Sequence, residues 1–235
     1  MRSRLSRTFV VSKSAFGATQ LTVIGQTVRG SAAAAVLQSI ANKSTGYRTL
    51  KGNCTQKTMG EAVANVARRM NETVEEEKDT LDLSACKLIN FPDAVYKVLR
   101  NVTEKIHVIT LANNEFKSLT SKFITNFGQL KELNLEGNHL TKLPDVIGTM
   151  LHLTTINLAR NKFTAFPEKL TDIKTLERIN LEGNEISEVP MDKLAAMPSL
   201  QCLNMKSNPI KKKKLTASTP PITFELLTTP EDNVV

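Results

Sequence analysis

Between residues 106 and 210 the chain repeats one pattern about every 23 residues, and this repetition constrains the fold more than any other feature. One repeat of this length cannot bury its own apolar side chains, so successive copies must stack on one another. An earlier copy differs only in carrying cysteine where the others have asparagine. In chain order the copies are Thr80–Pro92, Ile106–Phe116, Leu130–Leu140, Leu151–Phe163, Leu176–Ile186 and Leu200–Ile210.

Each copy contains a short alternating segment that predicts one β-strand. In the third copy Leu133 and Leu135 are expected to point inward, while Glu132 and Asn134 alternate with them on the opposite face. One strand per copy predicts a parallel sheet with one buried face and one polar face.

A column of polar residues stands at the end of each strand, spaced 24, 23, 23 and 24 residues apart from the second copy onward. A buried side-chain amide can bond the backbone groups that are left open where the chain turns out of the strand. Cysteine can replace it in the first copy because a thiol behaves as a small, weakly polar group. We interpret this column as a structural ladder: Cys86, Asn114, Asn138, Asn161, Asn184 and Asn208.

These positions together resemble the leucine-rich repeat family. The resemblance extends over residues 58–210 and includes a predicted helix at 58–77, which has Thr58 and Glu61 at capping-box spacing. It implies an α/β solenoid with a curved parallel β-sheet on the concave side and irregular or helical returns on the convex side. Proline just past the strand turn starts four of the expected returns: Pro92, Pro144, Pro167 and Pro190.

The predicted organisation has four parts. Residues 1–57 form a basic, acid-free extension that we expect to be disordered, and 58–78 form an N-terminal cap helix. Residues 79–210 hold six repeats, and 211–235 contain a lysine run and a C-terminal cap or tail in which 220–227 reads as a closing strand or loop.

The positive charge of the chain lies in its N-terminal extension. Residues 1–57 hold nine Lys and Arg and no acid, whereas 58–235 hold 22 Lys and Arg against 23 Asp and Glu. Such a composition is found in mitochondrial transit peptides, in disordered interaction tails and in extensions without a targeting role, and the sequence leaves these three open. We find neither a secretory signal nor an apolar run of the about 20 residues that a membrane-spanning helix needs. Three unclustered cysteines favour a reducing compartment, so we expect a cytoplasmic protein, with mitochondria as the alternative.

Few residues suggest catalysis. His107, His139 and His152 lie on different repeats at none of the usual metal-ligand spacings, and no phosphate-binding loop or nucleophile elbow occurs. Glu136 and Glu182 share a column of the polar face, but an open sheet offers no water-excluding pocket. We therefore expect no enzyme, no cofactor and no metal.

The polar face remains as the candidate site. Its central column of Asn134, Asn157, Asn180 and Asn204 either binds a partner's backbone or pairs with itself along the sheet, and we favour self-pairing. The full set of candidate protein-binding residues is Glu132, Asn134, Glu136, Asn157, Arg160, Arg178, Asn180, Glu182, Asn204 and Lys206.

The resulting hypothesis is a monomeric, non-enzymatic intracellular module or adaptor that binds one or more proteins. The alternative is association with nucleic acid or an anionic membrane through the extension and Lys211–Lys214. We disfavour nucleic acid because the repeat region is nearly neutral and no aromatic residues accompany the lysines for base stacking.

Overall fold

The computed structural model describes residues 9–13, 19–23, 26–27, 65–210 and 221–229. Within the N-terminal extension it contains strands β1 (Phe9–Lys13), β2 (Thr19–Val23) and β3 (Gln26–Thr27), which form an antiparallel sheet in the order β1-β2-β3. The remaining extension residues lie outside the described part, so disorder there stays a prediction.

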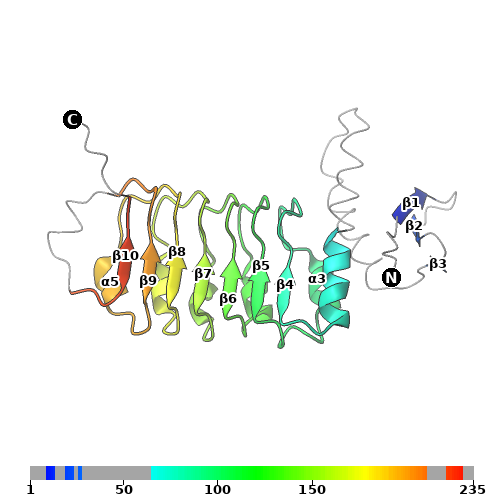
Figure 1. Cartoon of the computed structure of the whole chain (residues 1–235), viewed down its shortest axis with the longest axis horizontal. Helices are drawn as coiled ribbons and strands as arrows, with labels where there is room; N and C mark the ends of the chain where they lie inside the picture. Colours follow the sequence, from blue (N-terminus) through cyan, green and yellow to red (C-terminus); the bar gives the residue numbers. More distant parts are fainter. Residues whose placement is uncertain (1–8, 14–18, 24–25, 28–64, 211–220, 230–235) are drawn as a thin grey trace, which may run out of the picture.

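A parallel sheet of seven strands forms the body of the repeat region (Figure 1). Its order is β10-β9-β8-β7-β6-β5-β4, so strands adjacent in sequence are adjacent in space, as stacked repeats require. The strands are β4 (Thr80–Asp82), β5 (Val108–Thr110), β6 (Glu132–Asn134), β7 (Thr155–Asn157), β8 (Arg178–Asn180), β9 (Cys202–Asn204) and β10 (Glu225–Leu227).

Short helices form the returns between strands. They are α3 (Asp93–Val98), α4 (Ser121–Asn126), the 3₁₀ helices η2 (Asp145–Thr149) and η3 (Glu168–Asp172), and α5 (Met191–Ala195). Four of the five begin directly after the prolines named above, whose φ angles lie between −68° and −80°. Proline fixes φ in this range and lacks the N–H that the first turn leaves unbonded, so it suits the start of these four returns. The helix α4 begins after Thr120 instead. We call the sheet face turned away from these helices the concave face.

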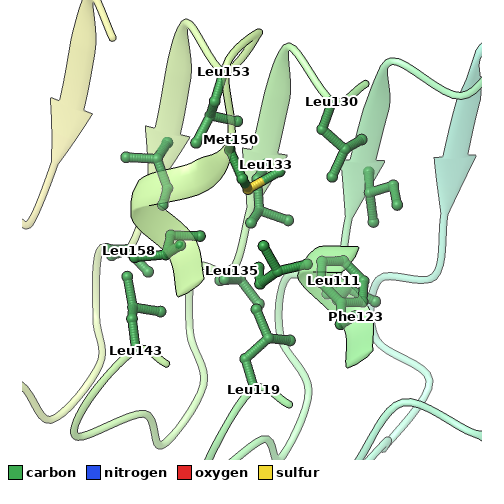
Figure 2. Packing of buried hydrophobic residues seen from close by; sticks show 14 of the residues in the cluster. Leu111, Leu119, Phe123, Leu130, Leu133, Leu135, Leu143, Met150, Leu153 and Leu158 are labelled. Atoms are coloured by element: carbon green, nitrogen blue, oxygen red, sulfur yellow. The ribbon is translucent and has the colours of Figure 1, made fainter. Parts of the chain in front are cut away.

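The core lies between the sheet and the returns. The inward strand residues Ile109, Leu133, Ile156, Ile179 and Leu203 are at most 1 % exposed, and leucines from the strands and returns interdigitate between them (Figure 2). Five phenylalanines outside the strands are also buried in this core: Phe116, Phe123, Phe127, Phe163 and Phe166.

Helical residues 65–75 cover the β4 end of the array. Val66 and Met70 are buried in the same core as the strands, and Thr73 is buried beside them. The helix ends two residues before the predicted position 77, because Glu77 adopts a left-handed φ of 47° and the Lys78 N–H bonds the Thr73 carbonyl. The capping box at Thr58 and Glu61 lies outside the described residues.

At the other end, β10 pairs in parallel with β9 and adds a seventh strand to the six from the repeats. Phe224, just before it, is buried in the core. Within the predicted closing segment 220–227, residues Glu225–Leu227 form a strand, whereas 221–224 have no regular structure. Lys211–Lys214 lie outside the described residues.

Candidate functional site

The strand-end asparagines hold successive repeats together. Asn161 shows the pattern: its Nδ2 donates to the carbonyls of Leu135, Leu158 and Ala159 at 3.0–3.2 Å, and its Oδ1 accepts the Leu140 N–H at 3.0 Å. Two of these four partners belong to the preceding repeat, so each asparagine ties its own turn to its neighbour's. The same arrangement recurs at Asn114, Asn138, Asn184 and Asn208.

The residue before each ladder position adopts a left-handed conformation, with φ between 53° and 67°. The set is Ala85, Asn113, Gly137, Arg160, Gly183 and Ser207. This turn aims the following side chain inward and the left-handed residue outward, beside the concave face. Only two of the six positions are glycine, so side chains of different chemistry stand here, and they decide what borders the face.

The concave face itself carries three columns of outward residues. The first flank runs from Thr80 to Glu225 and contains the exposed Glu132 and Arg178. The central column contains the half-buried Asn134, Asn157, Asn180 and Asn204. In the third column Ala112 and Ala159 are buried, whereas Glu136 and Glu182 are half-exposed and Lys206 is exposed.

The central asparagines do not bond one another, which corrects the self-pairing that we favoured from the sequence. In each the Oδ1 accepts the N–H two residues later on its own strand, as for Asn134 and Glu136 at 3.0 Å. Two of the amide nitrogens bond carboxylates on the preceding repeat: Asn157 to Glu136 and Asn204 to Glu182. The chain turns away directly after each asparagine, so its own backbone is a nearer partner than the next asparagine along the sheet.

The negative charge of Glu136 is balanced by a positive charge of the same chain. Its Oε2 accepts from Asn157 at 3.0 Å and its Oε1 accepts from the guanidinium of Arg160, with which it forms an ion pair. The Glu136 side chain is 25 % exposed and the Arg160 side chain 66 %, so the cation covers the carboxylate from the solvent side.

The cap helix reaches the first strand of the face through Arg69. Its Nη1 donates to the Ser84 carbonyl at 2.8 Å and to the Asp82 carboxylate at 3.2 Å. Burial opposes ionisation of Asp82, but hydrogen bonds from Ser84 and the charge of Arg69 outweigh it and hold the Asp82 pKa below its usual value. Because the repeat pattern does not encode how the helix meets the first strand, sequence analysis did not identify Arg69 as a neighbour of the face.

At the opposite end the first flank carries a thiol. Cys202 is half-buried between the strands of Arg178 and Glu225. Partial burial and the negative charge of Glu225 raise the Cys202 pKa, against the opposing effect of Arg178. A raised pKa lowers the thiolate fraction at neutral pH and makes this thiol a poor nucleophile. Glu225 was absent from the candidate residues, since it lies on the closing strand rather than on a repeat.

The described residues contain no cluster of three or more His, Cys, Asp or Glu that could hold a metal ion. Glu136 and Glu182 lie in separate hydrogen-bond networks on different repeats, and His139 and His152 are exposed side chains of different repeats. Within the same residues no helix is long and apolar enough to cross a membrane.

Comparison with known proteins agrees with this geometry. A leucine-rich repeat family model matches residues 104–163 and 151–210. Leucine-rich repeat-containing protein 20 of Mus musculus is 57 % identical over 174 residues, covering 74 % of this chain and 95 % of the mouse protein. The protein of that name from Homo sapiens is also 57 % identical, over 175 residues and 95 % of its length.

The leucine-rich repeat domain of the type III effector XopL superposes with a TM-score of 0.56 at 19 % identity, covering 82 % of this chain and 65 % of that structure. This similarity concerns the fold alone. Leucine-rich repeat proteins generally mediate protein–protein interaction and are typically non-enzymatic. From the repeat pattern, the ladder and the sequence relatives together, the chain belongs to the leucine-rich repeat family.

Proposed function

We propose that this chain is a non-enzymatic interaction module that binds a segment of a partner protein on the concave face of β6–β9. The observation that carries the proposal is a set of outward charges that the fold does not use. Glu132 and Arg178 are exposed on the first flank, and neither side chain has an ion pair or hydrogen bond within the described residues. The structural asparagines, by contrast, bond through both the oxygen and the nitrogen of the amide, and all of them except Asn208 are buried.

The available area restricts how the partner is held. The seven strands of the sheet lie about 4.8 Å apart, and the outward columns span about five residues of about 3.3 Å each, so the whole face projects to roughly 480 Å² and the part over β6–β9 to about half of that. A stable interface buries about 800 Å² per partner. The left-handed turns beside the face, including Arg160 and Ser207, would have to contribute, or the complex is transient.

The test is a charge reversal that disturbs no internal contact. Glu132→Lys combined with Arg178→Glu leaves net charge unchanged and removes no side-chain bond of the described structure. The matched control reverses two exposed charges on the helical face, Lys97→Glu with Asp145→Lys, and is also neutral overall. Isolated surface charges change stability by no more than about 0.5 kcal/mol, so both variants should fold.

Affinity capture from one lysate, with quantitative mass spectrometry and circular dichroism on each variant, gives the readout. We expect the concave reversal to deplete specific partners that wild type and the control retain. The opposite result, partners lost from the control and kept by the concave variant, would move the site to the helical face. Salt titration of the captured complex checks the chemistry, since phosphate neutralisation by a nucleic acid gives a much steeper salt dependence.

We also propose a cytoplasmic, monomeric protein. The two cysteines of the described region, Cys86 and Cys202, are free thiols, which suits a reducing compartment. Fusing residues 1–57 to a fluorescent protein tests the mitochondrial alternative. Diffuse fluorescence is expected, and co-localisation with a mitochondrial dye would reject the proposal.

A further inference from the structure

Two repeats of the concave face carry the same local structure. The sequence Asn-Leu-Glu-Gly-Asn occurs at 134–138 and again at 180–184. In both, the asparagine Oδ1 accepts the glutamate N–H, at 3.0 and 3.1 Å, and the glutamate Oε2 accepts an amide from the next strand, at 3.0 and 2.8 Å. The two units therefore present their carboxylates in the same way, two repeats apart.

The units differ in what reaches the second carboxylate oxygen. At Glu136 the Oε1 is bonded by Arg160, three residues after Asn157. The equivalent residue of the second unit, three after Asn204, is Ser207. Both have left-handed backbones, with φ of 53° and 55°, so their side chains point away from the backbone in the same direction. The serine side chain is too short to make the contact that arginine makes.

Glu182, half-exposed like Glu136, therefore has one amide partner, Asn204, and no ion pair in the described part of the chain. Its neighbour Lys206 takes the column position of Ala159, and the two side chains form no salt bridge. The Nδ2 of Asn180, on the same strand, likewise donates to no acceptor among the described residues. Among the described residues, one carboxylate oxygen of Glu182 and the amide nitrogen of Asn180 thus lack a hydrogen-bond partner.

We propose that Glu182, framed by Asn180 and Asn204, receives the guanidinium of an arginine from a partner protein, in the position that Arg160 occupies at Glu136. The inference rests on the proposed concave-face function and specifies its ligand. The first unit shows that a guanidinium fits over this carboxylate while the amide bond is kept. Arginine suits the site better than lysine because its planar fork can donate more than one hydrogen bond to the same carboxylate.

The chain offers a matched pair of variants. Ser207→Arg supplies Glu182 with an internal arginine and closes the site, whereas Arg160→Ser removes the internal arginine from Glu136 and opens a second one. Each variant places a residue type that the equivalent repeat already holds at the same φ, so the backbone accepts both. The Ser207 N–H, which donates to the Thr229 hydroxyl, is kept in Ser207→Arg.

The experiment titrates the full ¹⁵N-labelled chain with the pentapeptide acetyl-Ala-Ala-Arg-Ala-Ala-amide. Binding is monitored by NMR through the chemical shifts of the side-chain amides of Asn204 and Asn157. A second peptide replaces arginine by citrulline, which keeps the shape and removes the charge. In wild type we expect saturable shifts at Asn204 with arginine, and binding of the citrulline peptide weaker by at least about tenfold. Ser207→Arg should abolish the shift at Asn204, and Arg160→Ser should add one at Asn157.

Equal responses to the two peptides, no response at Asn204, or an Asn204 response that persists in Ser207→Arg would each overturn the inference. Dispersed amide spectra for both variants confirm that they are folded. Should the peptide fail at Asn204 while Glu132→Lys with Arg178→Glu still abolishes capture, only the arginine site is wrong. If the peptide binds as expected but the charge-reversed variant captures the same partners as wild type, the first flank does not bind the partner and the arginine site is still supported.

Discussion

Two columns of asparagine run along this solenoid only a few residues apart, and they have different structural roles. The inner column, represented by Asn161, is buried and bonds backbone groups of two repeats with both ends of its amide. The outer column is half-buried, and each of its asparagines bonds its own backbone through the oxygen. Asn157 and Asn204 also donate to a surface carboxylate, whereas Asn180 uses only its oxygen among the described residues. The same residue type is thus scaffold in one column and available surface in the other.

The position of an asparagine relative to the strand turn therefore determines whether its amide stabilises the fold or stays at the surface. The left-handed residue between the columns turns the chain by enough to send Asn161 inward, where water cannot replace its partners. Asn180 precedes the turn and keeps its amide nitrogen at the surface. An identical substitution in the two columns should therefore have very different consequences, and the following substitutions test that contrast.

The largest effect is expected from Asn161→Asp, which keeps the shape and replaces the amide donor by a carboxylate oxygen. That oxygen would face the carbonyls of Leu135, Leu158 and Ala159. An unpaired buried charge costs more than the about 1–3 kcal/mol of an unsatisfied neutral group, so we expect a loss of about 3 kcal/mol or more at neutral pH.

This loss should depend on pH. Burial and facing carbonyls raise the folded-state pKa of the new carboxyl above its unfolded value, so the folded state binds the proton more tightly. Stability of the variant relative to wild type should then rise as pH falls below that pKa, because the protonated form donates a hydrogen bond again. Urea unfolding at pH 5 and pH 7.5 measures it, and a pH-independent difference would contradict the burial of the new charge.

Much of this architecture follows from the sequence. The spacing of leucines identified the strands, and the fixed asparagines and prolines identified the turns and the starts of four returns. These features repeat, so each copy supports the interpretation of the others. The partners of the outer asparagines could not be obtained this way, because they depend on whether the neighbouring repeat has glutamate or alanine, as at Glu136 and Ala159, and on side-chain rotamers.

Sequence analysis also missed contacts made by elements that occur only once in the chain. Arg69 borders the face only because the cap helix crosses β4 at one particular angle, and Glu225 extends the first flank only because the chain returns to pair with β9. The Arg160 contact needed a left-handed arginine, which local propensity does not favour. The candidate site thus depends on departures from the repeat, whereas the fold depends on the repeat itself.

A second prediction compares positions along the inner column. Asn161→Leu should destabilise the protein by about 1–3 kcal/mol, because turn backbone groups of two repeats lose their partner. Asn208→Leu should cost less, since Asn208 is half-exposed and water can replace part of its bonding. Asn114, although nearer the N-terminal end, is buried and accepts from both Cys86 and Leu88, so it should resemble Asn161. Chemical unfolding of the three variants checks this order, and an Asn208 variant as damaged as Asn161→Leu would refute it.

The third prediction concerns Asp82, the first member of the central column. Like Asn180 it accepts the N–H two residues later, from Ser84 at 2.8 Å, but unlike Asn180 it is also bonded by Arg69. Arg69→Met keeps the aliphatic packing and removes the bonds to β4, and we expect a loss of about 1 kcal/mol.

The Asp82 pKa supplies an independent check on the same variant. Because the folded pKa lies below the unfolded value, the stabilisation from Asp82 is present above the unfolded pKa and is lost as pH falls through the folded one. Arg69→Met should weaken this acid dependence below about pH 4. Thermal unfolding of both proteins between pH 2.5 and 7 measures it, and parallel curves would show that Arg69 does not hold the cap through Asp82.

The smallest effect is expected from Asn180→Asp, the counterpart of Asn161→Asp in the outer column. The oxygen that accepts the Glu182 N–H is retained, and the lost donor has no acceptor within the described residues. The new carboxylate would lie two residues from Glu182 but also two from Arg178 on the same strand, so repulsion and attraction nearly offset one another at the surface. We expect a change in unfolding free energy within about 0.5 kcal/mol, measured in the same urea series as Asn161→Asp. A loss approaching that of the inner variant would mean that the outer amides are also scaffold, and would leave the concave face without its open donor.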